Sequence, residues 1–207
     1  MNLRDELTRS RVVPVITATD IELTVTLCGA LAAGGMTCVE ITLRTAAALD
    51  SIRAVKARYP ELLVAAGTVT QPAHLVAAQQ AGVDVCISPG ISAELLQSAD
   101  EHSMPFLPGV ATASEIMLGM AHGLDTFKLF PAQAIGGMAL LKSLHGPFPE
   151  VRFCPTGGLG RDNFRDYLAL PNVICCGGSW MVTQTLIESG RWLDIEALAQ
   201  EAVSSSA

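Results

Sequence analysis

Lys128 lies in the stretch DTFKLFPA (residues 125–132), between Phe127 and Phe130. The chain has only three lysines, and lysine is among the residues least often buried without a partner. A lysine in an apolar, strand-like segment therefore suggests a chemical task. Loss of water around a lysine disfavours its ammonium form, and the neutral amine is a nucleophile that forms a Schiff base with a ketone. The segment predicts imine chemistry at Lys128.

A carboxylate and a guanidinium are predicted to face the same space as this amine. Side chains alternate between the two faces of a strand, so CVEITLR (residues 38–44) places Glu40, Thr42 and Arg44 together. The apolar residues between them would face outward, toward covering helices. Glu40 can carry the protons that imine formation requires, and Arg44 is a natural fork for a substrate carboxylate.

Lysine, glutamate and arginine together indicate an imine-forming enzyme that acts on a 2-oxo acid. The alternative is a buried ion network that only fixes the core. Burial of three charges is costly, and natural cores seldom pay that cost without a function. The other two lysines, Lys56 and Lys142, fall in helical patterns, and we expect them to face solvent.

Glycine pairs near the end of the chain suggest an anion site. PTGGLGRDN (residues 155–163) and GGSW (residues 177–180) each follow an expected strand. Glycines there let backbone N–H groups approach an anion closely, and the last two strands of α/β barrels often bind phosphate. The candidate residues are Gly157, Gly158 and Ser179, with Gly178 beside them. The alternative is that these glycines only make tight turns.

Short β-rich runs alternate with helical patterns along the whole chain, about 20 to 25 residues apart. Eight such units in a chain of this length predict an α/β fold, a single-domain (β/α)8 TIM barrel over residues 1–207 with an N-terminal helix. A doubly wound open sheet is the alternative, but nothing in the spacing marks its switch point. The expected strands span residues 12–18, 38–44, 62–69, 83–88, 105–110, 126–130, 151–156 and 173–177.

Composition excludes several classes of partner. The 207 residues carry a net charge of -7, have a mean hydropathy of +0.40 and include no basic run. We therefore expect no binding to nucleic acid and none to a membrane. The charged N-terminal stretch MNLRDELTRSR has no apolar segment typical of a secretory signal, so we expect a cytoplasmic protein.

The cysteines and histidines show no metal-binding spacing. None of the six cysteines forms a C-x-x-C pattern, and none of the four histidines an H-x-H or H-E-x-x-H pattern. We expect the cysteines to be buried apolar side chains, and we expect neither a metal nor another cofactor.

Six motifs in this order resemble the 2-keto-3-deoxy-6-phosphogluconate (KDPG) aldolases, many of which also act on 4-hydroxy-2-oxoglutarate (KHG). The motifs are VEITLRT, AAGTV, ISPG, FKLFPA, RFCPTGG and GGSW. The resemblance implies a metal-independent class I aldolase and a homotrimer of barrels. It implies the following roles: Lys128 as the Schiff-base lysine, Glu40 as the proton acceptor and donor, Arg44 on the substrate carboxylate, Thr68 as an assisting group, Pro89 and Phe130 as pocket lining, and Gly157, Gly158 and Ser179 on the phosphate.

One residue departs from the pattern of some relatives. They carry an arginine at the end of the first strand that can reach the phosphate, where this chain has Thr17. The departure makes an unphosphorylated substrate such as KHG a plausible alternative to KDPG. A phosphate-binding barrel isomerase or epimerase would keep the glycine pairs but would not need an inward lysine, and a non-catalytic barrel would not need the three charged residues.

Overall fold

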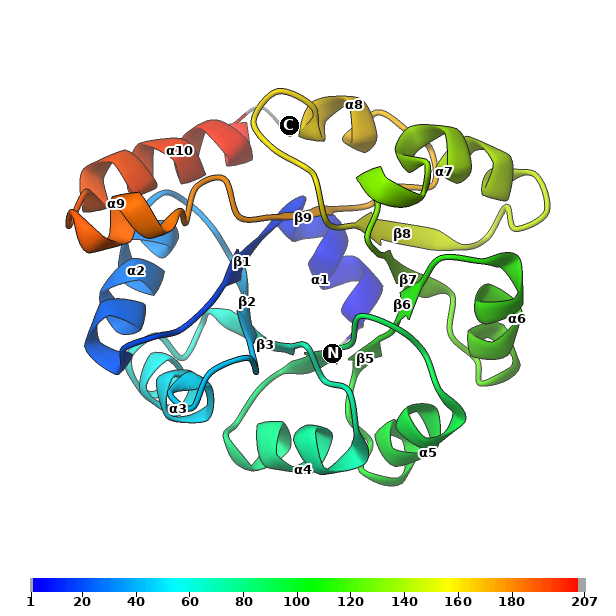
Figure 1. Cartoon of the computed structure of the whole chain (residues 1–207), viewed down its shortest axis with the longest axis horizontal. Coiled ribbons are helices and arrows are strands. Elements are labelled where there is room, and N and C mark those ends of the chain that lie inside the picture. The colour runs from blue at the N-terminus through cyan, green and yellow to red at the C-terminus, as the bar shows by residue number, and fades with distance from the viewer. Residues whose placement is uncertain (1, 205–207) are drawn as a thin grey trace.

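The computed structural model describes residues 2–204 as parallel strands ringed by helices (Figure 1). Strands and helices alternate from the first strand onward, as the sequence predicted. The strands are β1 (Val12–Ile16), β2 (Cys38–Thr42), β3 (Leu63–Gly67), β4 (Val85–Ile87), β5 (Phe106–Leu107), β6 (Gly109–Val110), β7 (Thr126–Leu129), β8 (Arg152–Pro155) and β9 (Cys176–Gly178).

The strands form a curled parallel sheet in two hydrogen-bonded parts. The larger part has the order β5-β4-β3-β2-β1-β9, and the smaller has the order β6-β7-β8. Single bridges between Phe153 and Val173 and between Thr156 and Gly177 connect β8 to the segment around β9. The architecture is thus an α/β fold with a curled parallel sheet.

Proline divides one expected strand into two. Residues 105–110 were predicted as one strand, but β5 and β6 are separated at Pro108. Proline has no N–H group to donate to a neighbouring strand, so the ladder is interrupted there. The Pro108 carbonyl still accepts a hydrogen bond from the Lys128 N–H, at 2.9 Å.

The strands end earlier than the apolar patterns suggested. β2 ends at Thr42, and Arg44 lies in the turn that follows instead of in the strand. β1 ends at Ile16, so Thr17 also lies in a loop. The residues that follow the strand ends are therefore positioned by their own hydrogen bonds and not by the sheet.

Helices lie outside the strands, and side chains cap several of their N-termini. Asp20 accepts a hydrogen bond from the Leu23 N–H at 2.9 Å, and Thr112 forms a capping box with Glu115. The helices are α1 (Leu3–Ser10), α2 (Ile21–Ala33), α3 (Ala48–Arg58), α4 (Pro72–Gln80), α5 (Ala93–Glu101), α6 (Ala113–Ala121), η1 (Gln133–Ile135), α7 (Gly137–His145), α8 (Phe164–Leu168), α9 (Gln184–Glu188) and α10 (Trp192–Ser204).

Two apolar layers hold the fold together. The outer layer lies between the sheet and the helices and includes Val39, Ile41, Phe127 and Leu129. An inner layer, which we call the inner plug, fills one end of the space inside the strands, and α1 covers it with Leu7 (Figure 1). The inner plug consists of Leu7, Val13, Cys38, Ala65, Val85, Ile87, Leu107, Cys154, Ile174 and Cys175.

In the part of the chain that the structure describes, no helix combines the length and the apolar character needed to cross a membrane.

Candidate active site

The Lys128 amine and the Glu40 carboxylate meet inside the curled sheet. Lys128 Nζ lies 3.1 Å from Glu40 Oε1 and 3.2 Å from Oε2. The two side chains are only 7% and 3% exposed. Side chains of β2 and β7 alternate between the two faces as predicted. Val39 and Phe127 pack in the outer layer, while Glu40 and Lys128 face inward. The arrangement pairs an amine with a proton carrier at hydrogen-bond distance.

A glycine makes room for the carboxylate of this pair. A Cβ atom at Gly67 would overlap the Glu40 carboxylate, so β3 must carry a glycine where it passes this side chain. Gly109, which is in register with Lys128, makes room for the backbone at Pro89 instead, because a Cβ atom there would overlap the Pro89 carbonyl oxygen. The position of the Glu40 carboxylate therefore depends on a neighbouring strand that lacks a side chain at this point.

Phe130 and Thr68 lie directly after the ends of β7 and β3. The Lys128 amine lies 5.4 Å from the centroid of the Phe130 ring, within the range of a cation–π interaction. Thr68 has a φ of 61°, which is unusual for a β-branched residue and is concentrated at functional sites. Neither Thr68 nor Pro89 forms a hydrogen bond with the Lys128–Glu40 pair among the described residues.

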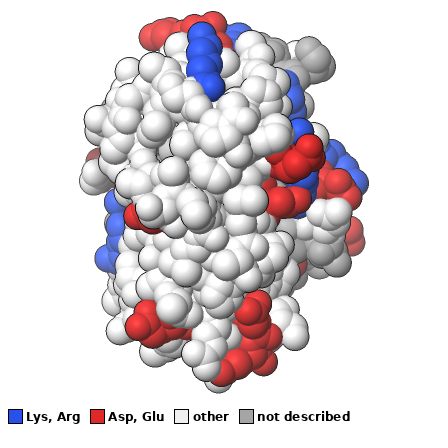
Figure 2. Space-filling view, turned by 90° about the vertical axis from the view of Figure 1, so that its right-hand side faces the viewer, with Lys and Arg blue, Asp and Glu red and all other residues white. Residues whose placement is uncertain are grey.

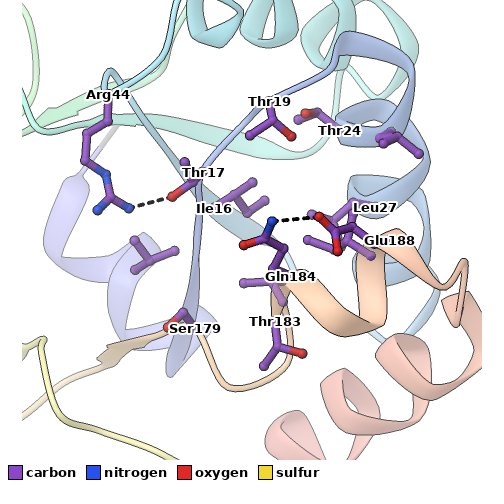
Figure 3. Close-up of a pocket in the computed structure, with 14 residues that line it drawn as sticks. Ile16, Thr17, Thr19, Thr24, Leu27, Arg44, Ser179, Thr183, Gln184 and Glu188 are labelled. Atoms are coloured by element: carbon purple, nitrogen blue, oxygen red, sulfur yellow. Dashed lines mark hydrogen bonds between the residues drawn. The ribbon is translucent and has the colours of Figure 1, made fainter.

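Arg44 is held by two threonine hydroxyls. Its NH2 group donates to Thr17 Oγ1 at 2.6 Å (Figure 3). Its Nε donates to Thr42 Oγ1 at 3.1 Å. Thr42 Oγ1 in turn donates to the Ile16 carbonyl oxygen at 2.9 Å. The guanidinium is exposed but fixed in direction by groups from β2 and from the loop after β1.

A pocket of about 410 Å³ opens beside Arg44 (Figure 3). Thr17 and Ser179 line it together with Arg44, and its far walls come from α2 and α9. Lys128 and Glu40 do not line this pocket. Pro89 lines a second, smaller hollow of about 210 Å³.

The candidate anion loops have the backbone that glycine allows. Gly157 and Gly158 have φ values of 99° and 80°, in the left-handed region that favours glycine. A Cβ atom at Gly157 would come within 3.4 Å of the Phe130 ring, which places this loop next to the predicted lysine site. A Cβ atom at Gly158 would overlap Gln133. Ser179 is exposed at the end of β9.

All six cysteines are free and buried. Burial raises the pKa of Cys28 and of Cys86 to about 12 and raises that of Cys175 well above its usual value. A hydrogen bond from Cys175 lowers the pKa of the Cys154 thiol, and the Lys128 ammonium acts in the same direction, while burial opposes them. Among residues 2–204, no group of three histidine, cysteine or acidic side chains is placed to hold a metal ion.

Lys56 and Lys142 were both expected to face solvent, and only one of them does. Lys142 is exposed on α7. Lys56 is instead only 20% exposed and pairs with Asp84 at 2.8 Å, so the prediction that it faces solvent was wrong. The helical pattern around Lys56 could not reveal this, because Asp84 belongs to the loop before β4.

Comparison with known proteins identifies the family. Residues 3–198 match the family model described as "KDPG and KHG aldolase". The chain belongs to this family. It is 48% identical over 200 residues to the KHG/KDPG aldolase of Escherichia coli K12, covering 97% of this chain and 94% of the relative. It is also 48% identical over 194 residues to the 2-dehydro-3-deoxy-phosphogluconate aldolase of Pseudomonas aeruginosa, covering 94% of this chain and 88% of the relative.

Solved structures of the KDPG and KHG aldolase family share the fold. The KDPG aldolase of Legionella pneumophila, described with pyruvate captured at low pH as a covalent carbinolamine intermediate, has a TM-score of 0.95, 40% identity and 98% coverage of both chains. The KDPG aldolase of Zymomonas mobilis ZM4, described with 3-phosphoglycerate, has a TM-score of 0.91 and 42% identity, covering 99% of this chain and 96% of that one.

Three residues of this aldolase's site were not recognised from its sequence. Thr17 was noted only as a departure from an arginine, Thr42 only as a member of the inward face, and Gly67 only as part of a motif. The inward alternation of β2 already placed Thr42 between Glu40 and Arg44, so its contact with Arg44 could have been expected. The roles of Thr17 and Gly67 depend on which strands are neighbours, which the local pattern does not specify.

We predict that Gly67→Ala lowers kcat by about 10²-fold, within the range for loss of a general acid–base group. The added methyl group would push the Glu40 carboxylate away from Lys128. Steady-state kinetics and a thermal melt would check this, with Gly146→Ala as the control, because position 146 is exposed and has room for a methyl group. An unchanged kcat would show that Glu40 does not need its observed position.

We also predict that Lys128→Met lowers the free energy of unfolding by about 3–5 kcal/mol, because it leaves the Glu40 carboxylate buried without a partner. The double variant Lys128→Met/Glu40→Met should recover most of this loss, since both charges are then absent. Urea denaturation of the two variants and the wild type measures the difference. A double variant as unstable as the single one would contradict the view that the unpaired carboxylate causes the loss.

Proposed function

We propose that this chain is a class I aldolase that cleaves KDPG to pyruvate and glyceraldehyde 3-phosphate, with Lys128 as the Schiff-base lysine and Glu40 as the proton acceptor and donor. The observation that carries the proposal is the buried amine of Lys128 3.1 Å from the buried carboxylate of Glu40. The pyruvate carbinolamine named for the Legionella pneumophila aldolase supports the same chemistry.

Imine formation begins when a proton leaves the Lys128 amine for Glu40 along their hydrogen bond. The neutral Nζ then attacks the C2 carbonyl carbon of KDPG and forms a carbinolamine. Glu40 returns the proton to the C2 hydroxyl, which leaves as water and gives an iminium ion. A single carboxylate at 3.1 to 3.2 Å from the amine serves both proton transfers.

Cleavage uses the iminium ion as an electron sink. Glu40, directly or through a water, removes the proton of the C4 hydroxyl, the C3–C4 bond breaks, and its electron pair moves toward the iminium nitrogen. Glyceraldehyde 3-phosphate leaves and an enamine remains on Lys128. Protonation at C3 and addition of water at C2 release pyruvate and the free amine.

The two ends of the substrate would be held by different groups, of which Arg44 and Ser179 line the same pocket. Arg44 would bind the carboxylate of the pyruvoyl end, as a fork of two N–H donors. Backbone N–H groups at Gly157 and Gly158 and the Ser179 hydroxyl would bind the phosphate. Thr68, Pro89 and Phe130 would complete the pocket around the reacting carbons.

KDPG is the proposed main substrate because the names of the Escherichia coli and Pseudomonas aeruginosa relatives both refer to it. KHG, which would give pyruvate and glyoxylate by the same steps, is the secondary substrate. Membership of an aldolase family removes the phosphate-binding isomerase and the non-catalytic barrel as alternatives.

For the fold as a whole, we propose a closed (β/α)8 barrel formed by residues 1–207 as one domain. Counted as one strand interrupted at Pro108, β5 and β6 bring the number of strands to eight. The bridges from Phe153 to Val173 and from Thr156 to Gly177 support closure between β8 and β9.

The aldolase is proposed to act as a cytoplasmic homotrimer without a cofactor. Six free cysteines favour a reducing compartment. Around α6 the surface is largely uncharged, with Met117 61% exposed and Met120 45% exposed (Figure 2). An uncharged face of this kind suits contact between subunits better than contact with nucleic acid or an anionic membrane.

Borohydride reduction in the presence of pyruvate should attach a single reduced pyruvyl group to the peptide that contains Lys128. Lys128→Ala should give no adduct and no turnover, because no other lysine is buried beside a carboxylate at the site. Intact mass and peptide mapping provide the measurement, with Lys142→Ala as the control, since Lys142 is exposed. An adduct on another residue, or turnover by Lys128→Ala, would remove the Schiff-base assignment.

Ser179→Ala should raise KM for KDPG by roughly tenfold, because a hydroxyl bond to a charged phosphate is worth about 1.5–3 kcal/mol. KM for KHG, which has no phosphate, should change much less. Kinetics with both substrates test the assignment, with Ser143→Ala on α7 as the control. Equal changes for the two substrates would argue against a phosphate at Ser179.

A further inference from the structure

We propose that Thr17 is a positioning residue that fixes the Arg44 guanidinium for the carboxylate of the 2-oxo acid. The inference rests on the proposed role of Arg44 in carboxylate binding. In this proposal the loop after β1 acts at the carboxylate end of the substrate. The resemblance to some relatives had instead linked this position to the phosphate end.

The geometry gives Thr17 a direct hold on Arg44 (Figure 3). Arg44 NH2 donates to Thr17 Oγ1 at 2.6 Å, which is shorter than the bond from Arg44 Nε to Thr42 Oγ1 at 3.1 Å. Thr42 holds the opposite side through Nε and is itself anchored to the Ile16 carbonyl. The guanidinium thus has one fixed partner from each of two adjacent segments, and the remaining N–H groups are left for a ligand.

Arg44 is exposed and lies in the turn after β2, so the sheet does not fix its side chain. A long side chain in this position would otherwise sample several rotamers, and ordering it on binding would cost affinity. The two hydroxyls order it before the ligand arrives.

The neutral hydroxyl partners of Arg44 also suit the binding of a substrate carboxylate. Among residues 2–204, Arg44 forms no ion pair with an acidic side chain, and its two side-chain partners are neutral hydroxyls. A carboxylate partner would neutralise the guanidinium and compete with the substrate carboxylate. A hydroxyl acceptor directs the N–H group but leaves the positive charge available in the pocket that Thr17 and Arg44 share.

The test compares pyruvate with pyruvamide, which replaces the carboxylate by a neutral amide of similar shape. Cyanoborohydride trapping on Lys128 is measured against the concentration of each compound, and the half-saturating concentration is the readout. Thr17→Val should raise this concentration for pyruvate by about 5- to 20-fold, because the variant loses one hydrogen bond to a charged group. Solvent around the exposed Arg44 side chain moderates this loss. The same variant should leave the value for pyruvamide and the maximal trapping rate unchanged.

Two further variants separate positioning from general damage. Thr17→Ser keeps the hydroxyl and should restore wild-type half-saturation for pyruvate. Thr26→Val removes an exposed hydroxyl on α2, bonded to the Glu22 carbonyl and outside the pocket, and should match the wild type. A thermal melt of each variant confirms folding.

The outcomes distinguish this inference from the proposed function. If the wild type is trapped by pyruvate but Thr17→Val behaves identically, the positioning role is overturned and the Schiff-base chemistry stands. Equal losses for pyruvate and pyruvamide, or failure of Thr17→Ser to restore affinity, also overturn it. If the folded wild type is not trapped by pyruvate at all, the aldolase proposal and the positioning role fall together.

Discussion

The buried ion pair between Lys128 and Glu40 joins two distant parts of the sheet. The two residues are 88 positions apart in the sequence, on β7 and β2, which belong to the two different hydrogen-bonded parts of the sheet. Two ions taken out of water are costly unless each meets the other at hydrogen-bond distance. The sheet must therefore curl far enough to bring these strands face to face across its interior.

The interior is divided into a filled end and an open end, and the pair lies between them. The inner plug closes one end with apolar side chains and thiols, and α1 covers it. On the other side of the pair the strands turn to glycine, at Gly67, Gly109 and Gly177, where added side chains would overlap neighbouring groups. The plug closes one end of the interior with apolar side chains. At the other end the glycines let neighbouring groups, among them the Glu40 carboxylate, pack closely against the strands.

The sequence predicted this arrangement to the extent that it depends on local alternation. The period of two placed Glu40 and Lys128 on inward faces, and the repeated strand–helix units predicted the parallel sheet. The ends of the strands were less predictable, because apolar residues continue past them, at Ala18 after β1 and at Leu43 after β2. The division at Pro108 could have been foreseen from its missing N–H group. The Arg44–Thr17 and Lys56–Asp84 contacts could not, because each joins segments more than 25 residues apart.

The two basic side chains of the candidate site have opposite kinds of partner, and the difference matches the role proposed for each. Lys128 is proposed to lose and regain protons, and its partner is a carboxylate that can take them. Arg44 is proposed to keep its charge for the substrate, and its partners are hydroxyls that orient it without neutralising it. Exchanging the partners would give a lysine with no proton carrier and an arginine already paired with an anion. The local choice of partner, more than the net charge of -7, makes an acidic protein able to hold an anionic substrate.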